Sequence, residues 1–292
     1  GGPVCRDLIN LSPGADLSFF NCSKLTTIQN IEFWDISNLT STAFMFQSCV
    51  LFTGDLSNWD MSNVTNAFFM FATAKAFNSD VSSWDTSSIT NFTYMFANAE
   101  SFNSDINFDL TSATNNAYGI FNGCISFNGD VSGMDTSTLT FMNNMFNDCT
   151  SLNNNSMMGW DVSNVVYMTN MFSGCSSFDQ DFTTWDTSNV DSMFRMFSGA
   201  NVFNGTVSVF DTSSVTDMRS MFQSAILFNQ PIGNWDVSSV TNMEQMFYNA
   251  EDFNQDISSW DVSNVNNFKG MFQGADDFNK PLTNWDIVAT GL

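Results

Sequence analysis

One dipeptide recurs along the whole chain at a nearly constant spacing. A tryptophan followed by an aspartate, or a close equivalent of this pair, occurs eleven times, and consecutive copies begin 24 to 26 residues apart. The copies begin at Trp34, Trp59, Trp84, Phe108, Met134, Trp160, Trp185, Phe210, Trp235, Trp260 and Trp285. A fixed period of this length predicts a solenoid, in which each turn buries its apolar side against its neighbours. We therefore expect function on an extended surface rather than in one pocket.

Positions in the repeat can be numbered as columns, with the tryptophan as column 0. Columns 5, 8, 12 and 15 are apolar, and in one turn they are Val240, Met243, Phe247 and Ala250. Steps of three and four residues predict one face of a short helix. The next apolar residues, Phe253 and Ile257, predict a short strand. The predicted fold is an α/β solenoid: a leucine-rich-repeat-like stack of about ten to eleven 25-residue turns, each with one short helix and one short strand in a parallel sheet.

A single array needs no internal domain boundary. We expect residues 1–30 to form an N-terminal cap segment and residues 31–292 to form one repeat solenoid. The sequence stops seven residues after Trp285, part-way through a turn, so the solenoid is expected to be uncapped at its C-terminus.

Several columns keep nearly one residue type. All eight tryptophans stand in column 0, and phenylalanine fills column 12 in ten turns from Phe46 to Phe272. Stacked turns would bring these rings into ladders that bury large apolar areas. A methionine-rich aromatic stripe can also line a binding groove, but a core is the better interpretation because every turn must hide these side chains.

The six cysteines are even in number, which allows disulfides. They are Cys5, Cys22, Cys49, Cys124, Cys149 and Cys175. Four of them fall in column 15, and Cys22 joins them if its unit carries a two-residue insertion before Trp34. Neighbouring turns would place column-15 alpha carbons about 5 Å apart, within disulfide range. We predict a Cys5–Cys22 bond and one pair among Cys124, Cys149 and Cys175. A Cys22–Cys49 pair and a row of buried thiols are the alternatives.

Aspartate stands in column 1 of every turn, and serine in column 3 of most. Such residues cap the free backbone N–H groups of a helix start. Asparagine in column 19 is expected to bond the backbone of a bend in the same way. The alternative for the aspartates is a calcium ladder, because calcium prefers carboxylate oxygens. Its candidate ligands are Asp60, Asp85, Asp186, Asp236 and Asp261. No other cofactor is expected.

Charge and composition exclude several functional classes. The net charge is −23, with 30 acidic and 7 basic residues, so nucleic acid is not an expected partner. No apolar run is long enough to span a bilayer, so membrane insertion is not expected. The chain contains no histidine, which excludes the common serine and cysteine triads and histidine-based zinc sites. We do not expect an enzyme.

Seven Asn-x-Ser/Thr sequons are candidate glycan acceptors if the protein is secreted by a eukaryote. They begin at Asn10, Asn21, Asn38, Asn63, Asn91, Asn154 and Asn204. Their number has a second explanation, because asparagine, serine and threonine are abundant and create sequons by chance.

Whole units such as Trp260-Asp-Val-Ser-Asn-Val and Met246-Phe recur in register over about residues 30–288. This unit resembles the BspA-like leucine-rich repeat surface proteins, and in particular their Trp-Asp and Met-Phe repeat subfamily, common in mycoplasma lipoproteins. The resemblance implies an extracellular or cell-surface protein used for adhesion, host interaction or coat building, without shared catalytic residues. Phe108, Met134 and an insertion at 153–158 depart from the pattern and mark a possible bend or specialised face.

Two functional interpretations follow. The first is a non-enzymatic extracellular structural protein whose uncapped solenoids stack head to tail into a surface filament or layer. The alternative is a monomeric adhesin or ligand-binding ectodomain with protein or glycan partners. Exposed aromatic residues would favour the alternative, and the candidates are Tyr94, Tyr118, Tyr167 and Tyr248.

Overall fold

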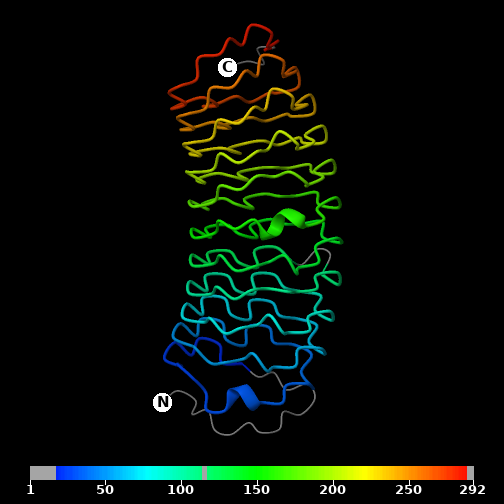
Figure 1. Ribbon diagram of the computed structural model, residues 1–292, viewed down its shortest axis with the longest axis vertical. Helices are drawn as coiled ribbons and strands as arrows, with labels where there is room; N and C mark the ends of the chain where they lie inside the picture. The colour runs from blue at the N-terminus through cyan, green and yellow to red at the C-terminus, as the bar shows by residue number, and fades with distance from the viewer. Residues whose placement is uncertain (1–17, 114–116, 288–292) are drawn as a thin grey trace.

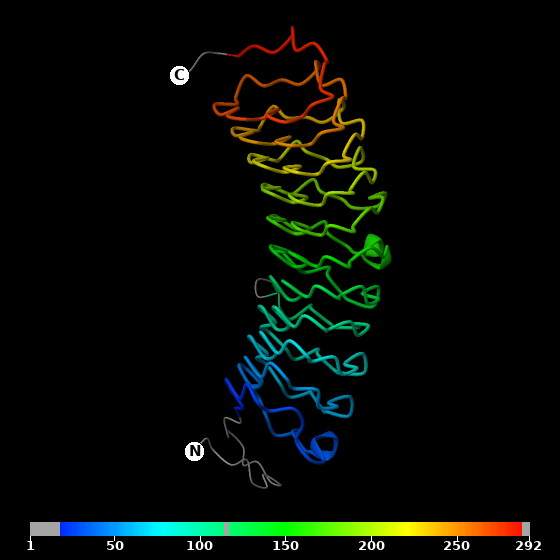
Figure 2. The same cartoon turned by 90° about the vertical axis from the view of Figure 1, so that its left-hand side faces the viewer.

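The computed structural model describes residues 18–113 and 117–287, which form a single elongated stack of turns (Figure 1). The stack is gently curved (Figure 2). Its described helices are two short 3-10 helices, η1 (Ile31–Phe33) and η2 (Ser156–Gly159). Elsewhere the described residues form turns, bends and isolated parallel bridges between neighbouring turns. A repeat solenoid is therefore confirmed, whereas its predicted internal composition is wrong in two respects.

The predicted helix in each turn is absent from the described residues, and a series of β-turns takes its place. Met246 N donates to Met243 O at 3.2 Å, and Ala250 N donates to Phe247 O at 3.1 Å. Phe253 N donates to Ala250 O, also at 3.1 Å, and so forms the following β-turn. These are bonds between residues i and i+3, as in β-turns. The apolar residues begin and end the turns, so their spacing of three comes from turn length rather than from a helical face.

Backbone N–H groups that a helix would use internally bond instead to the next turn. Met243 N donates to Asn267 O, and Phe247 N donates to Met271 O, both at 2.9 Å. Gln245 and Asn249, at columns 10 and 14, have φ values of 57° and 54°. A left-handed residue interrupts a right-handed helix. Because the same two columns are left-handed throughout the described array, neighbouring turns impose this conformation on each turn.

The predicted strand is also misplaced. Except for Asp109↔Asp135 in column 1, the parallel bridges link column 7 of successive turns, as in Asn66↔Asn91 and Asn242↔Asn267. None of them lies in the segment from Phe253 to Trp260. In that segment the backbone bonds to side chains, since Asn254 N donates to Asn229 Oδ1 at 3.0 Å. Eight such bonds join the column-19 residues of nine successive turns, from Asn78 to Asn279. The predicted amide ladder is thus confirmed, and it replaces a strand.

One continuous apolar core runs through the stack from Phe19 to Met271. Phe197 lies between Phe172 and Phe222 with ring centroids 5.7 Å apart on each side and nearly parallel planes. Seven tryptophans add a polar link, because each indole Nε1–H donates to a backbone carbonyl of the preceding turn. The predicted aromatic ladders are therefore core, and the tryptophans also join the turns to one another.

The two aromatic ladders differ in ring spacing in the last turns. The rings of Trp235, Trp260 and Trp285 are 6.5 and 6.3 Å apart, whereas Phe247 and Phe272 are 5.8 Å apart. The tryptophan rings are therefore farther apart than the column-12 phenylalanine rings here. Figure 2 shows η1 and η2, each just before a tryptophan, on the outer side of the curve. Helix η2 absorbs the insertion at 153–158, and its buried Met157 continues the core.

The described part of the expected N-terminal cap packs on the first turn. Phe19 N donates to Met45 O at 2.7 Å, and the Phe19 ring stacks on Phe46 at 5.3 Å. The rest of this segment, including Cys5 and Asn10, lies outside the described residues.

Candidate binding face

The side of the stack that carries the parallel bridges is here called the bridge face, and it consists of columns 7, 9 and 10. It extends from Ser41 in the first turn to Gly270 in the last. A polar column-7 side chain shapes the backbone of most turns: Asn66 Oδ1 accepts from Phe68 N at 3.1 Å, and Asn242 Oδ1 accepts from Glu244 N at 3.0 Å. Such bonds from a side-chain oxygen to the backbone N–H two residues on stabilise a local bend of the chain. They leave the side chains of columns 9 and 10 exposed or half-buried along most of the stack.

The first four turns of the bridge face carry five contiguous aromatic side chains, here called the aromatic stripe. They are Phe44, Phe68, Phe69, Tyr94 and Tyr118. Neighbouring rings are 4.4 to 5.8 Å apart along the stripe from Phe44 through Phe68, Phe69 and Tyr94 to Tyr118. Their planes meet at 87°, 67°, 46° and 88° in that order. The rings form a herringbone row on the surface, separate from the stacked rings of the core.

The middle of the bridge face carries a second aromatic pair. Phe141 and Tyr167, both in column 7, stack at 5.4 Å with an angle of 4° between the planes. Each ring therefore covers one face of the other. Thr169 and Asn170 follow in the same turn, so the surface changes here from aromatic to amide and hydroxyl groups.

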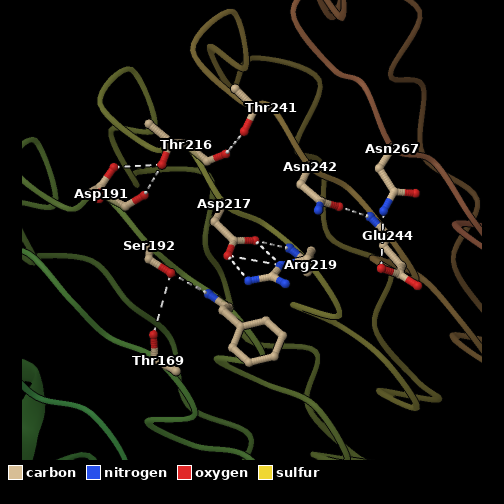
Figure 3. Close-up of polar contacts among 11 residues, drawn as sticks. Thr169, Asp191, Ser192, Thr216, Asp217, Arg219, Thr241, Asn242, Glu244 and Asn267 are labelled. Carbon is tan, nitrogen blue, oxygen red and sulfur yellow. Dashed lines mark hydrogen bonds and ion pairs between the residues drawn. The ribbon is translucent and has the colours of Figure 1, made fainter. Parts of the chain in front are cut away.

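The last four turns of the bridge face hold its charged residues, and Figure 3 shows Asp217, Arg219 and Glu244 among them. Arg219 forms a bidentate pair with Asp217, with Nε–Oδ1 2.9 Å and Nη2–Oδ2 2.6 Å. The Asp217 hydrogen bonds raise the pKa of the Arg219 guanidinium above its usual value. The guanidinium carbons of Arg219 and Arg195 lie 4.7 and 5.2 Å from the centre of the Phe194 ring. This ring thus contacts two cations of a strongly acidic chain.

The charged groups continue into the next two turns. Glu244 accepts from Asn267 Nδ2 at 3.2 Å and lies 3.8 Å from Lys269 Nζ. Asp191 accepts from the Thr216 hydroxyl at 2.7 Å (Figure 3). Three basic and two acidic side chains therefore lie on this part of the bridge face, and Asp191 in the adjoining column 6 balances the charge.

Charge divides the surface around the bridge face into two zones. Columns 2 to 13 of the first six turns contain no Asp, Glu, Lys or Arg. Columns 6 to 10 of the next four turns contain Asp191, Arg195, Asp217, Arg219, Glu244 and Lys269. An uncharged aromatic zone and a zone of paired charges thus follow one another along a single face.

The column-1 aspartates each cap a β-turn corner rather than a helix. Asp85 Oδ1 accepts from the Ser87 hydroxyl at 2.7 Å and from Ser87 N at 3.1 Å. These two bonds, the hydroxyl first, lower the pKa of Asp85. Asp60 and Asp236 make the same pair of bonds, and Asp186 and Asp261 accept at least from the backbone N–H. The structural interpretation holds, with a turn in place of the helix.

Calcium binding along these aspartates remains a prediction. In the described residues no three acidic or cysteine side chains converge in a metal-binding arrangement. The column-21 carboxylates line two open polar hollows of about 280 and 530 Å³, one at Asp80 and Asp105 and the other at Asp105 and Asp130.

The pair predicted among Cys124, Cys149 and Cys175 is absent, because all three are free thiols. Each is fully buried, and each Sγ donates to a carbonyl of the preceding turn at 2.9 to 3.1 Å. Burial raises the pKa of all three thiols. A small buried thiol satisfied by a carbonyl explains why cysteine alternates with alanine in column 15. The other predicted pair involves Cys5, outside the described residues.

The described sequons differ in how far their asparagines take part in the stack. Asn63 and Asn154 donate their Nδ2 groups to carbonyls of the preceding turn at 2.8 to 2.9 Å. Asn91 and Asn204 accept backbone N–H groups through Oδ1. Asn21 and Asn38 are exposed. Glycosylation remains a prediction; Asn63 and Asn204 are exposed as well, but only Asn21 and Asn38 combine exposure with no side-chain bond named above.

Comparison with known proteins places this repeat in a family. The model described as "Mycoplasma protein of unknown function, DUF285" matches residues 16–133, 115–214 and 203–290. The chain belongs to this family. Comparison of this DUF285 protein with curated proteins gives no significant match. Among the described residues of the DUF285 protein, no helix has the length and apolar character needed to cross a membrane.

Several solved structures resemble this DUF285 protein at low sequence identity. A leucine-rich repeat protein from Bacteroides ovatus is 13% identical, with a TM-score of 0.36 over 85% of this chain and 69% of that chain. A leucine rich cell surface protein from Faecalibacterium prausnitzii is also 13% identical, with a TM-score of 0.42 over 90% and 74%. A chain of the mouse RP105/MD-1 complex is 13% identical, with a TM-score of 0.31 over 89% of this chain and 41% of that chain.

Sequence reasoning found part of the bridge face. Three of the four predicted tyrosines, Tyr94, Tyr118 and Tyr167, lie on it, and Tyr248 stands in column 13 instead. The phenylalanines Phe44, Phe68, Phe69, Phe141 and Phe194 were missed. In a chain with 32 phenylalanines they resemble core residues. Their columns could have revealed them, because columns 7, 9 and 10 are polar in most other turns.

Proposed function

We propose that this DUF285 protein is a non-enzymatic repeat protein of the cell surface that binds macromolecular partners along the bridge face. The observation that carries the proposal is the concentration of two residue types. Three of the four tyrosines and two of the three arginines of the chain lie on this face. Tyrosine and arginine are enriched among the residues that dominate binding energy at protein interfaces. A core-forming role would not place them on the surface.

The chemistry of the remaining side chains supports a binding role over a catalytic one. The chain has no histidine, and Cys124, Cys149 and Cys175 are buried with raised pKa values. A catalytic thiol needs the opposite shift and access to substrate. Surface location is supported by the resemblance of the repeat to BspA-like surface proteins. Immunolabelling of intact cells tests it, and labelling that requires permeabilisation would contradict it.

Adhesion of protein-coated beads tests the binding role. Beads coated with the wild-type chain are applied to cultured cells and to immobilised extracellular matrix proteins, in parallel with beads coated with Arg195→Glu. We expect the variant to reduce bead retention severalfold, because Arg195 is exposed and its guanidinium lies on the bridge face. Lys75→Glu is the matched control, since Lys75 is a half-exposed cation outside this face. Equal retention of all three proteins would contradict the proposal.

Head-to-tail stacking into a filament or layer is a second candidate, favoured by one observation. In the last described turn, Phe268, Phe272, Leu282 and Trp285 are only partly buried and line an apolar hollow of about 320 Å³. An apolar end of a solenoid can accept another turn, either from the same chain or from a second copy. Sedimentation of the chain over a range of concentrations tests this candidate. Association that Phe268→Glu abolishes would support it, and a monomer at every concentration would contradict it.

A further inference from the structure

The aromatic stripe is held in a backbone conformation that disfavours aromatic residues. Phe44, Phe69 and Tyr94 stand in column 10 with φ values of 60°, 53° and 53°. The later turns place residues in the same conformation at this column, and these are Gly119, Asn144, Asn170, Arg195, Ser220, Gln245 and Gly270. Glycine and asparagine adopt left-handed φ most readily, whereas bulky side chains rarely do so. The first three turns therefore carry the least suitable residues of the column.

Burial in the core does not compensate for this conformation. The Phe44 side chain is 41% exposed, and Phe69 and Tyr94 are only partly buried. The next turn even makes room for the stripe, because a Cβ atom at Gly119 would collide with the Tyr94 ring. Residues that break a local preference without a gain in packing point to a role outside the fold.

The surroundings of the aromatic stripe resemble the centre of a protein interface. The flanking side chains are uncharged: Thr40, Thr65 and Thr90 precede it in column 6, and Ser48, Thr73 and Asn98 follow it in column 14. Interface centres are rich in aromatic residues and poor in charged ones, with polar groups at the rim. In a chain of net charge −23, a charge-free aromatic zone spanning several turns is the feature that fits this description best.

The geometry and the charge of the chain select the kind of occupant. A flat sugar chain needs a row of coplanar ring faces. In the stripe only Phe44 and Phe69 are near parallel, at 21° and 6.1 Å, and successive rings are inclined by 46° to 88°. The gaps of a herringbone row suit aliphatic or aromatic side chains instead. Aspartates recur in column 1 of every turn, and the fields of so many carboxylates attract cations and repel a second copy of this chain.

We propose that the aromatic stripe binds a cationic polypeptide, in which lysine or arginine side chains flank aromatic or aliphatic ones. The inference rests on the proposed function and specifies its partner class. The apolar side chains of the partner lie between the rings of Phe44, Phe69 and Tyr94. Its basic side chains are attracted by the negative field of the chain.

The test uses the full chain and a defined probe. A random dodecapeptide library is selected against the wild-type protein at low ionic strength. The enriched peptides are then synthesised, and their affinities are measured for the wild type and for the double variant Phe69→Asn/Tyr94→Asn. Asparagine is the residue that the chain itself uses at Asn144 and Asn170 in this column, so the variant is expected to fold. Circular dichroism and thermal unfolding check this directly. Leu227→Asn is the matched control, because Leu227 is 42% exposed and lies outside the bridge face.

We expect enriched peptides to combine basic with aromatic or aliphatic residues. Their affinity should fall about tenfold or more in the double variant, the effect of losing interface anchor residues, and stay unchanged in Leu227→Asn. It should also fall as salt is raised, because exposed charges are screened. No enrichment, enrichment of acidic or neutral peptides, or equal affinity of the double variant would overturn the inference.

Two further measurements distinguish a cationic polypeptide from the other two candidate occupants of the stripe, a carbohydrate and a second copy of the chain. Binding to a glycan array that the double variant abolishes would assign the stripe to carbohydrate, and dimerisation that it abolishes would assign the stripe to a second copy. Either result overturns the inference. If bead adhesion is lost in Arg195→Glu but retained in Phe69→Asn/Tyr94→Asn, the proposed function stands and only the inference about the stripe fails.

Discussion

At the scale of single residues, the polar side chains of this protein satisfy backbone groups at the corners of each turn. Asp85 binds the backbone and hydroxyl of Ser87, and Asn254 accepts from Asn279 of the next turn. Each turn is too short to satisfy its own backbone groups through a helix or a sheet. The repetition of aspartate, serine and asparagine therefore reflects the repetition of the corners.

The aspartate corners predict a dependence of stability on pH. The pKa values of Asp85, Asp161 and Asp236 are lowered, first by the hydroxyl of the serine two residues on and then by its backbone N–H. A lowered folded-state pKa stabilises the protein above the unfolded pKa of about 3.9 and loses this contribution as pH falls through the folded value. Urea unfolding followed by tryptophan fluorescence should show constant stability at pH 5 to 7 and a decline below about pH 4.

The control for this effect removes the titrating group and keeps the acceptor. In a triple variant of Asp85, Asp161 and Asp236 to asparagine, Oδ1 can still accept from the serine N–H. The decline below about pH 4 should become shallower than in the wild type. An identical decline would show that other carboxylates cause it.

Gly119 is the glycine whose replacement has the clearest expected effect. Its φ is 65°, and a Cβ there would collide with the Tyr94 ring. We expect Gly119→Ala to lower the free energy of unfolding by about 1 to 3 kcal/mol, from backbone strain and overpacking. In a Tyr94→Asn background the ring is gone, so the loss should be smaller. Equal losses in both backgrounds, measured by urea unfolding, would contradict the assigned clash.

At the scale of the elements, the unit of structure is a ladder between turns rather than a helix or strand within one. The phenylalanines of column 12 stack ring on ring, the column-19 amides bond turn to turn, and the indoles reach the preceding backbone. Each ladder needs the same residue type at the same place in neighbouring turns. This explains why the columns are nearly uniform. Phe182 stands in column 22, where most turns have a smaller aliphatic residue, and Phe210 stands in column 0, where most turns have tryptophan. Their ring centroids are 5.3 Å apart, so the larger residue in one column packs against the smaller ring in the other.

The indole ladder gives a prediction for Trp235. Its Nε1–H donates to Val207 O at 3.2 Å from a buried position. We expect Trp235→Phe to lower the free energy of unfolding by about 1 to 2 kcal/mol, from the lost hydrogen bond and reduced packing. Val207 O keeps its bond from Phe210 N, which limits the loss. Urea unfolding measures the change. A neutral substitution would show that the indole bond contributes nothing beyond ring packing.

At the scale of the whole molecule, the turns form one continuous core whose stability comes from contacts between neighbours. The buried thiols of Cys124, Cys149 and Cys175 lie on three successive turns near its middle and become accessible only when the stack opens there. Their raised pKa values further suppress the thiolate that reacts with disulfide reagents.

Thiol labelling therefore reports on opening of the stack. With 5,5′-dithiobis(2-nitrobenzoic acid) near pH 8, we expect these three thiols to react slowly in the native protein and rapidly in denaturant. The wild type is compared with a Cys124→Ala/Cys149→Ala/Cys175→Ala variant, whose alanines match the other turns. The difference between the two gives the reactivity of the three thiols. Rapid native labelling of all three would contradict a continuously packed core.

Sequence alone determined the period, the core columns and the single-array architecture, because each turn can bury its apolar residues only against equivalent residues of the next. The amide ladder through Asn254 and the capping role of Asp85 also followed from residue type and repetition. Local patterns could not separate a helix from successive β-turns, since both space apolar residues by three and four. Tertiary stacking decided that question by committing N–H groups such as those of Met243 and Phe247 to the next turn. It also decided that column 10, which carries Phe44, Phe69, Tyr94 and Arg195, is left-handed and lies on the surface.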